Sequence, residues 1–165
     1  MLNYKLETLD DNLKTEMVER QNEYWDEVAG GFHKFPPDVD WESYKLVQKN
    51  GRLVVICGRD KSNNLKAVAF IMITPHPHYA CIAASLPLLY IAKESRKGRE
   101  GIRLIKLIEK TAESCGAQLF MTHGGTHNKV AKLFEFLKYD DFGRYFVKVL
   151  PNGINGLNPV FKGGK

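Results

Sequence analysis

The chain has 165 residues, 44% hydrophobic and 26% charged, which is typical of one globular domain. No apolar run approaches the ~20 residues of a membrane-spanning helix, and the N-terminus shows no secretory signal. The three cysteines, Cys57, Cys81 and Cys115, are odd in number and lie in apolar contexts, so they indicate free thiols rather than a disulfide framework. We therefore expect a cytoplasmic protein without a membrane partner.

The net charge of +5 conceals an asymmetry along the chain. Residues 1–45 carry five Lys or Arg against eleven Asp or Glu, a balance of −6. Residues 46–165 carry nineteen against eight, a balance of +11. This pattern fits either a solvated surface with segregated charge or a chain whose second part attracts a polyanion.

The first 50 residues predict one strand and two helices. Residues 4–8 alternate polar and apolar side chains, which is typical of a strand, and Asp10 follows as a possible N-cap. An apolar stripe at helical spacing then predicts one helix from Leu13 to Val28, ended by Gly30 and Gly31. After a loop with two prolines, a shorter helix is expected from Asp40 or Trp41 to Lys49, closed by Asn50 and Gly51.

The next segment predicts strands. Two apolar runs, 52–58 and 66–74, flank a polar turn and indicate a hairpin. A long central strand is expected from Tyr79 to Ile91. Pro87 interrupts this strand and predicts a bulge or lost pairing, because proline has no N–H to donate.

The remaining elements alternate. A helix is predicted over 98–114, followed by a strand over 117–122, a helix over 128–138 and a last strand over 142–150. The inward face of the first of these helices should present Ile102, Ile105, Ile108, Ala112 and Cys115.

This order of elements predicts an α/β fold, with a mixed central sheet of about six to seven strands and helices on both faces. Residues 1–150 should form a single domain, and residues 151–165, rich in Gly and Asn, an irregular tail.

A basic, glycine-containing loop joins the central strand to the helix over 98–114. It reads Arg96-Lys97-Gly98-Arg99-Glu100-Gly101-Ile102. The N-terminus of a helix offers unpaired N–H groups and a partial positive charge, so this loop suits a phosphate group. The residues alone equally allow a basic turn with glycines for tight packing.

The loop resembles the coenzyme loop of the GNAT acetyltransferase superfamily, whose pattern is Arg/Gln-x-x-Gly-x-Gly/Ala. Arg96 and Gly101 fit the pattern, whereas Arg99 stands where the first glycine is usual. A second family element, beginning Asn-x-x-Ala, resembles residues 128–139. The resemblance covers residues 52–150, and the whole chain resembles small phage-encoded GNAT-like proteins.

This resemblance implies an N-acetyltransferase that uses acetyl-CoA and a primary amine as acceptor. Backbone groups of Leu89, Tyr90 and Ile91 would pair with the pantetheine arm, and the residues of the loop would hold the diphosphate. Asn128 would lie near the acetyl end of the cofactor or near its pantetheine arm. The acceptor stays open among a small molecule, a protein lysine and an N-terminus.

The usual catalytic side chains of the family are missing. Residues 84–87 contain no carboxylate to act as a base, and Phe134 replaces the frequent tyrosine acid. His78 is the candidate base, since its unperturbed pKa suits proton transfer. Solvated histidines in a turn, or water as the base, are the alternatives.

Other functional classes are less well supported. The pairs His76/His78 and His123/His127 have no carboxylate or cysteine beside them, so we expect no metal site. We expect no nucleic acid partner, because the aromatics show no stacking pattern, although an acyltransferase directed at DNA or RNA stays open. A GNAT-shaped binding or phage structural protein without catalysis is the main alternative. The sequence does not indicate an oligomeric state.

Overall fold

The structure is a computed structural model that describes residues 1–29, 38–124 and 130–143. Its elements are β1 (Asn3–Glu7), α1 (Asp11–Val18), α2 (Gln21–Ala29), α3 (Trp41–Lys49), β2 (Leu53–Arg59), β3 (Leu65–His76), β4 (Cys81–Ile91), η1 (Lys93–Ser95), α4 (Glu100–Ser114), β5 (Leu119–Met121) and α5 (Val130–Phe136). The strands form one mixed sheet in the order β1-β2-β3-β4-β5. Only the pairing of β4 with β5 is parallel.

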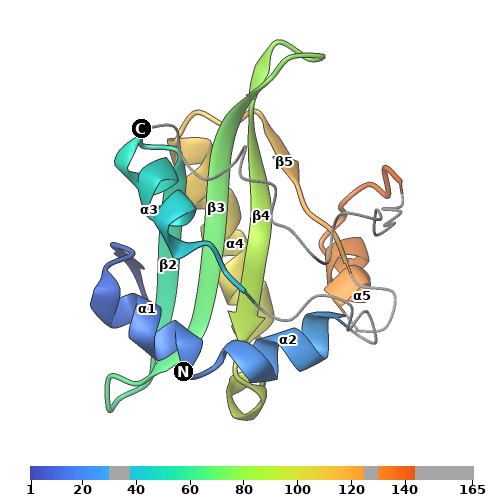
Figure 1. The fold of residues 1–165 in the computed structure, drawn as a ribbon. Coiled ribbons are helices and arrows are strands. Elements are labelled where there is room, and N and C mark those ends of the chain that lie inside the picture. Colours follow the sequence, from blue (N-terminus) through green and yellow to red (C-terminus); the bar gives the residue numbers. More distant parts are fainter. Residues whose placement is uncertain (30–37, 125–129, 144–165) are drawn as a thin grey trace, which may run out of the picture.

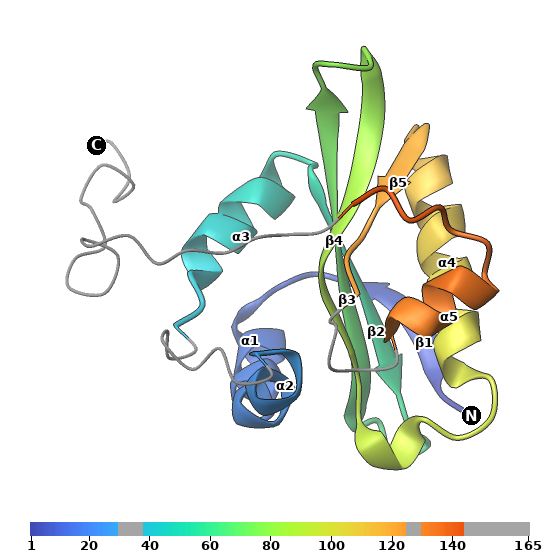
Figure 2. The same cartoon turned by 90° about the vertical axis from the view of Figure 1, so that its right-hand side faces the viewer.

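Helices cover both faces of the sheet. Helices α1, α2 and α3 lie on one face, and α4 and α5 on the other (Figure 2). The hairpin of β3 and β4 projects beyond the helices at one end of the molecule, and the loop before α4 lies at the opposite end (Figure 1). The predicted α/β class, the mixed sheet and the helices on both faces are thus confirmed.

Alternating side chains of the strands build one apolar core on each face. Phe70 and Val55 face α1 to α3, whereas Ile56 and Ile71 face α4. All four side chains are at most 1% exposed. Strands β2 and β3 therefore lie at the centre of the molecule and hold both helical layers.

The N-terminal part contains two helices where the sequence predicts one. Helix α1 begins at the Asp10 cap, whose side chain accepts a hydrogen bond from the N–H of Leu13 at 2.8 Å, and it ends at Val18. The N–H of Arg20 bonds to the carbonyl of Met17 at 3.1 Å, a tight turn that redirects the chain into α2. The apolar spacing continues through this turn, and no Gly or Pro marks it, so the sequence gives no sign of the break.

The bulge predicted at Pro87 is present. Met72 pairs with Ser85 and Phe70 with Leu88, so Ile71 of β3 faces the two residues Leu86 and Pro87 of β4. Two residues opposite one define a bulge, which bends a strand and increases its local twist. Strand β4 therefore changes direction near its middle.

One other prediction is corrected, and one is not confirmed. The inward face of α4 includes Ile105, Ile108 and Ala112 as expected, but Cys115 is exposed because it caps the end of the helix. The described residues hold five strands, so the predicted number of six to seven strands is not confirmed. The predicted strand over 142–150 begins with two described residues outside any strand, and residues 144–150 lie outside the described part, as does the expected tail over 151–165.

Candidate functional site

Strand β4 has two neighbours along only part of its length. Strand β5 pairs with Ala83, Ala84 and Ser85 and with no later residue of β4. Beyond this point the chain after β5 runs away from β4 (Figure 1). Among the described residues, Leu86 to Ile91 therefore have a strand, β3, on one side only.

The hydrogen bonds near the end of β4 show which backbone groups face this open edge. The N–H of Ala92 bonds to the carbonyl of Lys66 at 2.7 Å and so points toward β3. Backbone groups alternate in direction along an antiparallel strand, so Tyr90 also faces β3, whereas Leu89 and Ile91 face the open edge. Of the three residues predicted to pair with pantetheine, Leu89 and Ile91 have their backbone groups placed for it.

The loop after β4 presents the N-terminus of α4. Gly98 adopts a φ of +70°, a left-handed conformation that glycine tolerates best. The first hydrogen bond of the helix runs from the N–H of Arg103 to the carbonyl of Arg99 at 2.9 Å. The amides of Glu100, Gly101 and Ile102 precede it and lack partners within the helix, which is the arrangement that binds an anion.

Two of the arginines expected to add positive charge are engaged in ion pairs. Arg96 forms a bidentate pair with Glu27 of α2, and its Nε donates to the carbonyl of Ile91 at 2.7 Å. The Glu27 carboxylate raises the pKa of Arg96. Arg103 donates to Glu100 at 2.7 Å. The structure therefore ties α2 to the coenzyme-like loop through Arg96.

The two remaining basic residues of the loop are exposed. Lys97 and Arg99 flank Gly98, and both project beside the start of α4. They add positive charge next to the amides of the first turn. An anion at this helix terminus would meet both the N–H groups and these two side chains.

Gly101 brings α4 close to α5. A Cβ atom placed there would lie 3.3 Å from Cδ2 of Leu133, tighter than ordinary contact. The glycine that fits the family pattern thus also serves helix packing. Asn128, expected near the acetyl group, lies outside the described residues.

His78 is not brought together with the other candidates. It lies in the turn of the β3–β4 hairpin, beyond the end of the helices (Figure 1). Its ring is 6.0 Å from that of His76, which stacks on Tyr79 with centroids 4.6 Å apart. All of β4 separates this cluster from the loop at the start of α4. Within the described part of the chain, no three His, Cys, Asp or Glu side chains are grouped to hold a metal ion.

Residues 84–87 of β4 offer no acid or base, as the sequence indicates. The nearby Tyr139, which follows α5, donates a hydrogen bond from its hydroxyl to Glu109 of α4 at 2.6 Å. Burial and this contact raise the pKa of Tyr139. Its hydroxyl links α4 to the segment after α5, and this contact is structural.

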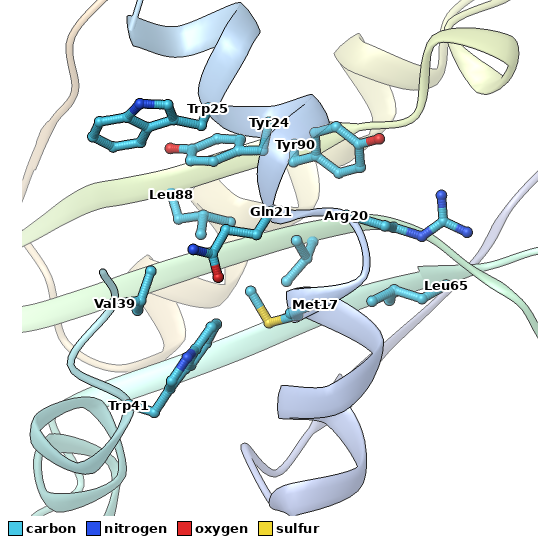
Figure 3. Close-up of a pocket in the computed structure, with 11 residues that line it drawn as sticks. Met17, Arg20, Gln21, Tyr24, Trp25, Val39, Trp41, Leu65, Leu88 and Tyr90 are labelled. Carbon is cyan, nitrogen blue, oxygen red and sulfur yellow. The ribbon is translucent and has the colours of Figure 1, made fainter. Parts of the chain in front are cut away.

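An aromatic pocket lies on the face of β4 that is turned away from α4, between the sheet and the N-terminal helices. Its cavity volume is about 80 Å³. Trp25 and Tyr24 of α2 line one side, Trp41 of α3 another, and Leu88 and Tyr90 of β4 the floor (Figure 3). Tyr24 and Tyr90 meet edge to face, with ring centroids 6.1 Å apart.

Tyr90 contributes a hydroxyl to this apolar environment. The side chain is 5% exposed, and its hydroxyl forms no hydrogen bond with the described residues. Burial, and then the nearby Glu23 carboxylate, raise the pKa of Tyr90 to about 12. The phenol is therefore protonated at neutral pH.

No sequence pattern predicted this pocket. Its walls come from segments as far apart as Met17 and Tyr90, so only the tertiary fold assembles them. One sign was available: both tryptophans of the chain, Trp25 and Trp41, flank the Pro36-Pro37 segment, whose residues 30–37, expected to include a loop, lie outside the described part of the chain.

Among the described residues, no helix combines the length and the hydropathy needed to cross a membrane. No protein-family model matches the sequence. No curated protein matches it either.

Solved structures match the fold closely at low sequence identity. A ribosomal-protein-alanine N-acetyltransferase from Brucella melitensis superposes with a TM-score of 0.65 at 15% identity, over 88% of this chain and 99% of its own. A predicted acetyltransferase from Clostridium acetobutylicum, solved with acetyl-CoA, gives 0.68 at 13% identity over 97% of both chains. An aminoglycoside acetyltransferase from an uncultured soil sample gives 0.68 at 10% identity, over 91% and 99%.

These similarities show that the chain has the fold of N-acetyltransferases, as the GNAT resemblance predicts. At this level of identity they show the fold alone. The names of the neighbours cover acceptors as different as an alanine of a ribosomal protein and an aminoglycoside. The fold therefore leaves the acceptor undetermined.

Proposed function

We propose that this protein is a GNAT N-acetyltransferase that binds acetyl-CoA along the open edge of β4. One observation carries the proposal: the edge of β4 beyond Ser85, which no described strand other than β3 adjoins, leads directly into a helix N-terminus that has a left-handed glycine and first-turn amides without partners in the helix. A cofactor that combines an amide-containing arm with a diphosphate would use both features. A packing turn alone would not require the open edge.

The backbone of the chain would provide most of the binding. The N–H and carbonyl of Leu89 and the N–H of Ile91 would pair with the pantetheine arm, since β3 leaves them unpaired. The amides of Gly101 and Ile102 would hold the diphosphate, and Lys97 and Arg99 would add charge from either side of Gly98. Tyr90 would support this strand through its side chain rather than its backbone.

When bound, acetyl-CoA would supply an activated acetyl group for transfer to an amine, with the proton of the amine ending on the departing thiolate. The chain would supply positioning and a backbone N–H of β4 to polarise the carbonyl. No carboxylate stands on residues 84–87, and His78 lies on the remote hairpin turn. Water is therefore our candidate for the base that takes the proton from the amine.

The engaged arginines favour a second candidate function. Because Arg96 is paired with Glu27 and Arg103 with Glu100, a binding or phage structural protein that shares this fold without catalysis is the alternative. Such a protein need not bind the coenzyme.

Calorimetric titration with CoA and acetyl-CoA tests the proposal. We expect saturable binding at one site, and a gain in unfolding free energy of about 2.7 kcal/mol at 100 times the dissociation constant. Release of free thiol in the presence of a panel of amines then tests for transfer. Binding without thiol release would favour the non-catalytic alternative. No binding at millimolar coenzyme would contradict both the cofactor and the enzyme.

A further inference from the structure

The aromatic pocket is the strongest remaining feature of the molecule, because the proposed cofactor does not use it. It lies on the face of β4 that carries α1 to α3, whereas the open edge and α4 lie beside and behind it (Figures 2 and 3). Leu88 and Tyr90 direct their side chains into it, and the residues between and after them, Leu89 and Ile91, present backbone groups to the open edge. The same segment of β4 therefore lines the pocket with its side chains and the open edge with its backbone.

The lining of the pocket selects for hydrocarbon. Four aromatic rings (Tyr24, Trp25, Trp41 and Tyr90) and the aliphatic Val39 and Leu88 dominate its walls. An apolar cavity of about 150 Å³ in another protein accommodates benzene, so this open cavity of about 80 Å³ fits a ring only in part or a branched alkyl group in full. A polyhydroxylated ligand would lose its hydration on these walls without new hydrogen bonds.

The surroundings of the pocket are acidic. Helix α2 carries Glu23 and Asp26, and Glu19 precedes it, whereas the carboxylate of Glu27 is paired with Arg96. Among the described residues that line the pocket, Arg20 is the one cation. Glu23 and Arg20 both lie near enough to Tyr90 to act on its hydroxyl, with opposite effects on its pKa. A cationic group outside the cavity would meet mostly carboxylates, and aromatic faces also attract cations.

We propose that this pocket binds a primary amine that carries an aryl or branched alkyl group, with the hydrocarbon on the tryptophans and the ammonium group toward α2. As the acceptor site of an acetyltransferase, the pocket rests on the function proposed above. As a binding site for such an amine, the pocket does not depend on that function, because the inference follows from its apolar lining and the acidic residues around it.

Both tryptophans of the chain line the pocket, so intrinsic fluorescence reports on it directly. We would titrate the full chain, without coenzyme, with 2-phenylethylamine. Ethanolamine and spermidine are the controls without an apolar group, and 2-phenylethanol is the control without a charge. We expect a saturable change in fluorescence and at least tenfold tighter binding of 2-phenylethylamine than of either polar amine. Equal affinity for all three amines would overturn the inference.

Two substitutions locate the ligand. Val68→Phe fills the cavity from β3 and should weaken 2-phenylethylamine at least tenfold. Glu23→Gln should weaken 2-phenylethylamine severalfold and leave 2-phenylethanol unchanged. Phe136→Leu, which alters an exposed aromatic on α5, is the matched control and should change neither. If Val68→Phe does not fold, Trp41→Leu replaces it, with Trp25 as the remaining fluorophore.

The outcome is independent of the coenzyme experiment. Binding of 2-phenylethylamine without binding of CoA would leave the pocket assigned and the acetyltransferase proposal refuted. Binding of CoA with no preference among the amines would leave the acetyltransferase proposal standing and refute the assignment of the pocket.

Discussion

From Ala83 to Ser85, β4 lies between β3 and β5, whereas from Leu86 to Ile91 it has a strand on one side only among the described residues. The two halves are continuous in sequence and similar in apolar character. The bulge at Leu86 and Pro87 separates them. A single strand can thus pair on both sides in one half and, after a bulge bends it, present backbone groups that no described strand pairs in the other half.

The largest expected effect concerns stability, and it contrasts the two halves directly. Ala84 is fully buried with Ile73 on one side and Phe120 on the other. Ala84→Asn should lower the unfolding free energy by about 3–5 kcal/mol, because it adds volume and an unsatisfied amide to a packed core. Leu89→Asn, at the half-buried open edge, should cost about 1–2 kcal/mol. Urea unfolding followed by circular dichroism measures both free energies. Equal losses of stability for the two variants would contradict the difference between the two halves of β4.

The second prediction concerns the end of the open half. Gly101→Asp should weaken CoA binding at least about 100-fold, or about 2.8 kcal/mol, because its carboxylate would repel the diphosphate. Gly101→Ala is the matched control, since its Cβ meets only the flexible end of Leu133. It should weaken binding by a few fold at most. Calorimetry decides: equal losses for both variants would assign the effect to packing against α5.

Much of the fold could be predicted from the sequence, because local patterns decide it. The Asp40 cap of α3, the bulge at Pro87 and the apolar face of α4 all follow from residues close in sequence. The turn at Arg20 was missed because the apolar spacing continues through it.

The site could be predicted only in part. The loop at Gly98 carries a local signal, but the Arg96–Glu27 pair joins residues 69 positions apart, and the pocket draws on five segments. The placement of His78 depends on the ends of the β3–β4 hairpin: β3 continues to His76, past the expected end at Thr74, and β4 begins at Cys81, after the expected start at Tyr79. Long-range packing, which no short motif records, decides these features.

The third prediction concerns the pocket face of the open half. Tyr90→Phe should change the unfolding free energy at neutral pH by no more than about 1 kcal/mol, because the hydroxyl is buried near Glu23 and Arg20 without a well-aligned hydrogen bond to the described residues. Because the pKa of Tyr90 is raised to about 12, the unfolded chain releases this proton first, and stability falls as the pH rises from about 10. The variant should lose less stability between pH 10 and 12. Thermal melts across that range measure it, and an unchanged pH profile would contradict the expectation.

The smallest expected effect concerns the link between α2 and the loop. Glu27→Gln releases Arg96 for the diphosphate, so CoA should bind about two- to fivefold tighter at low salt. The half-exposed pair should contribute under about 1 kcal/mol to stability. Glu94→Gln is the matched control, since Glu94 of η1, just before the loop, pairs with Lys66 of β3. Weaker CoA binding by Glu27→Gln would mean that the pair holds the loop in its binding conformation.

Amide hydrogen exchange along β4, resolved by NMR with and without CoA, tests the central claim most directly. In the free protein, the amides of Leu89 and Ile91 should exchange faster than that of Tyr90, which bonds to β3. Saturating CoA should slow exchange at Leu89, Ile91, Gly101 and Ile102, and leave Ala83 to Ser85 unchanged. Protection confined to other parts of the chain, with Leu89 and Ile91 still exchanging freely, would contradict the proposal that the coenzyme pairs with the open half of β4.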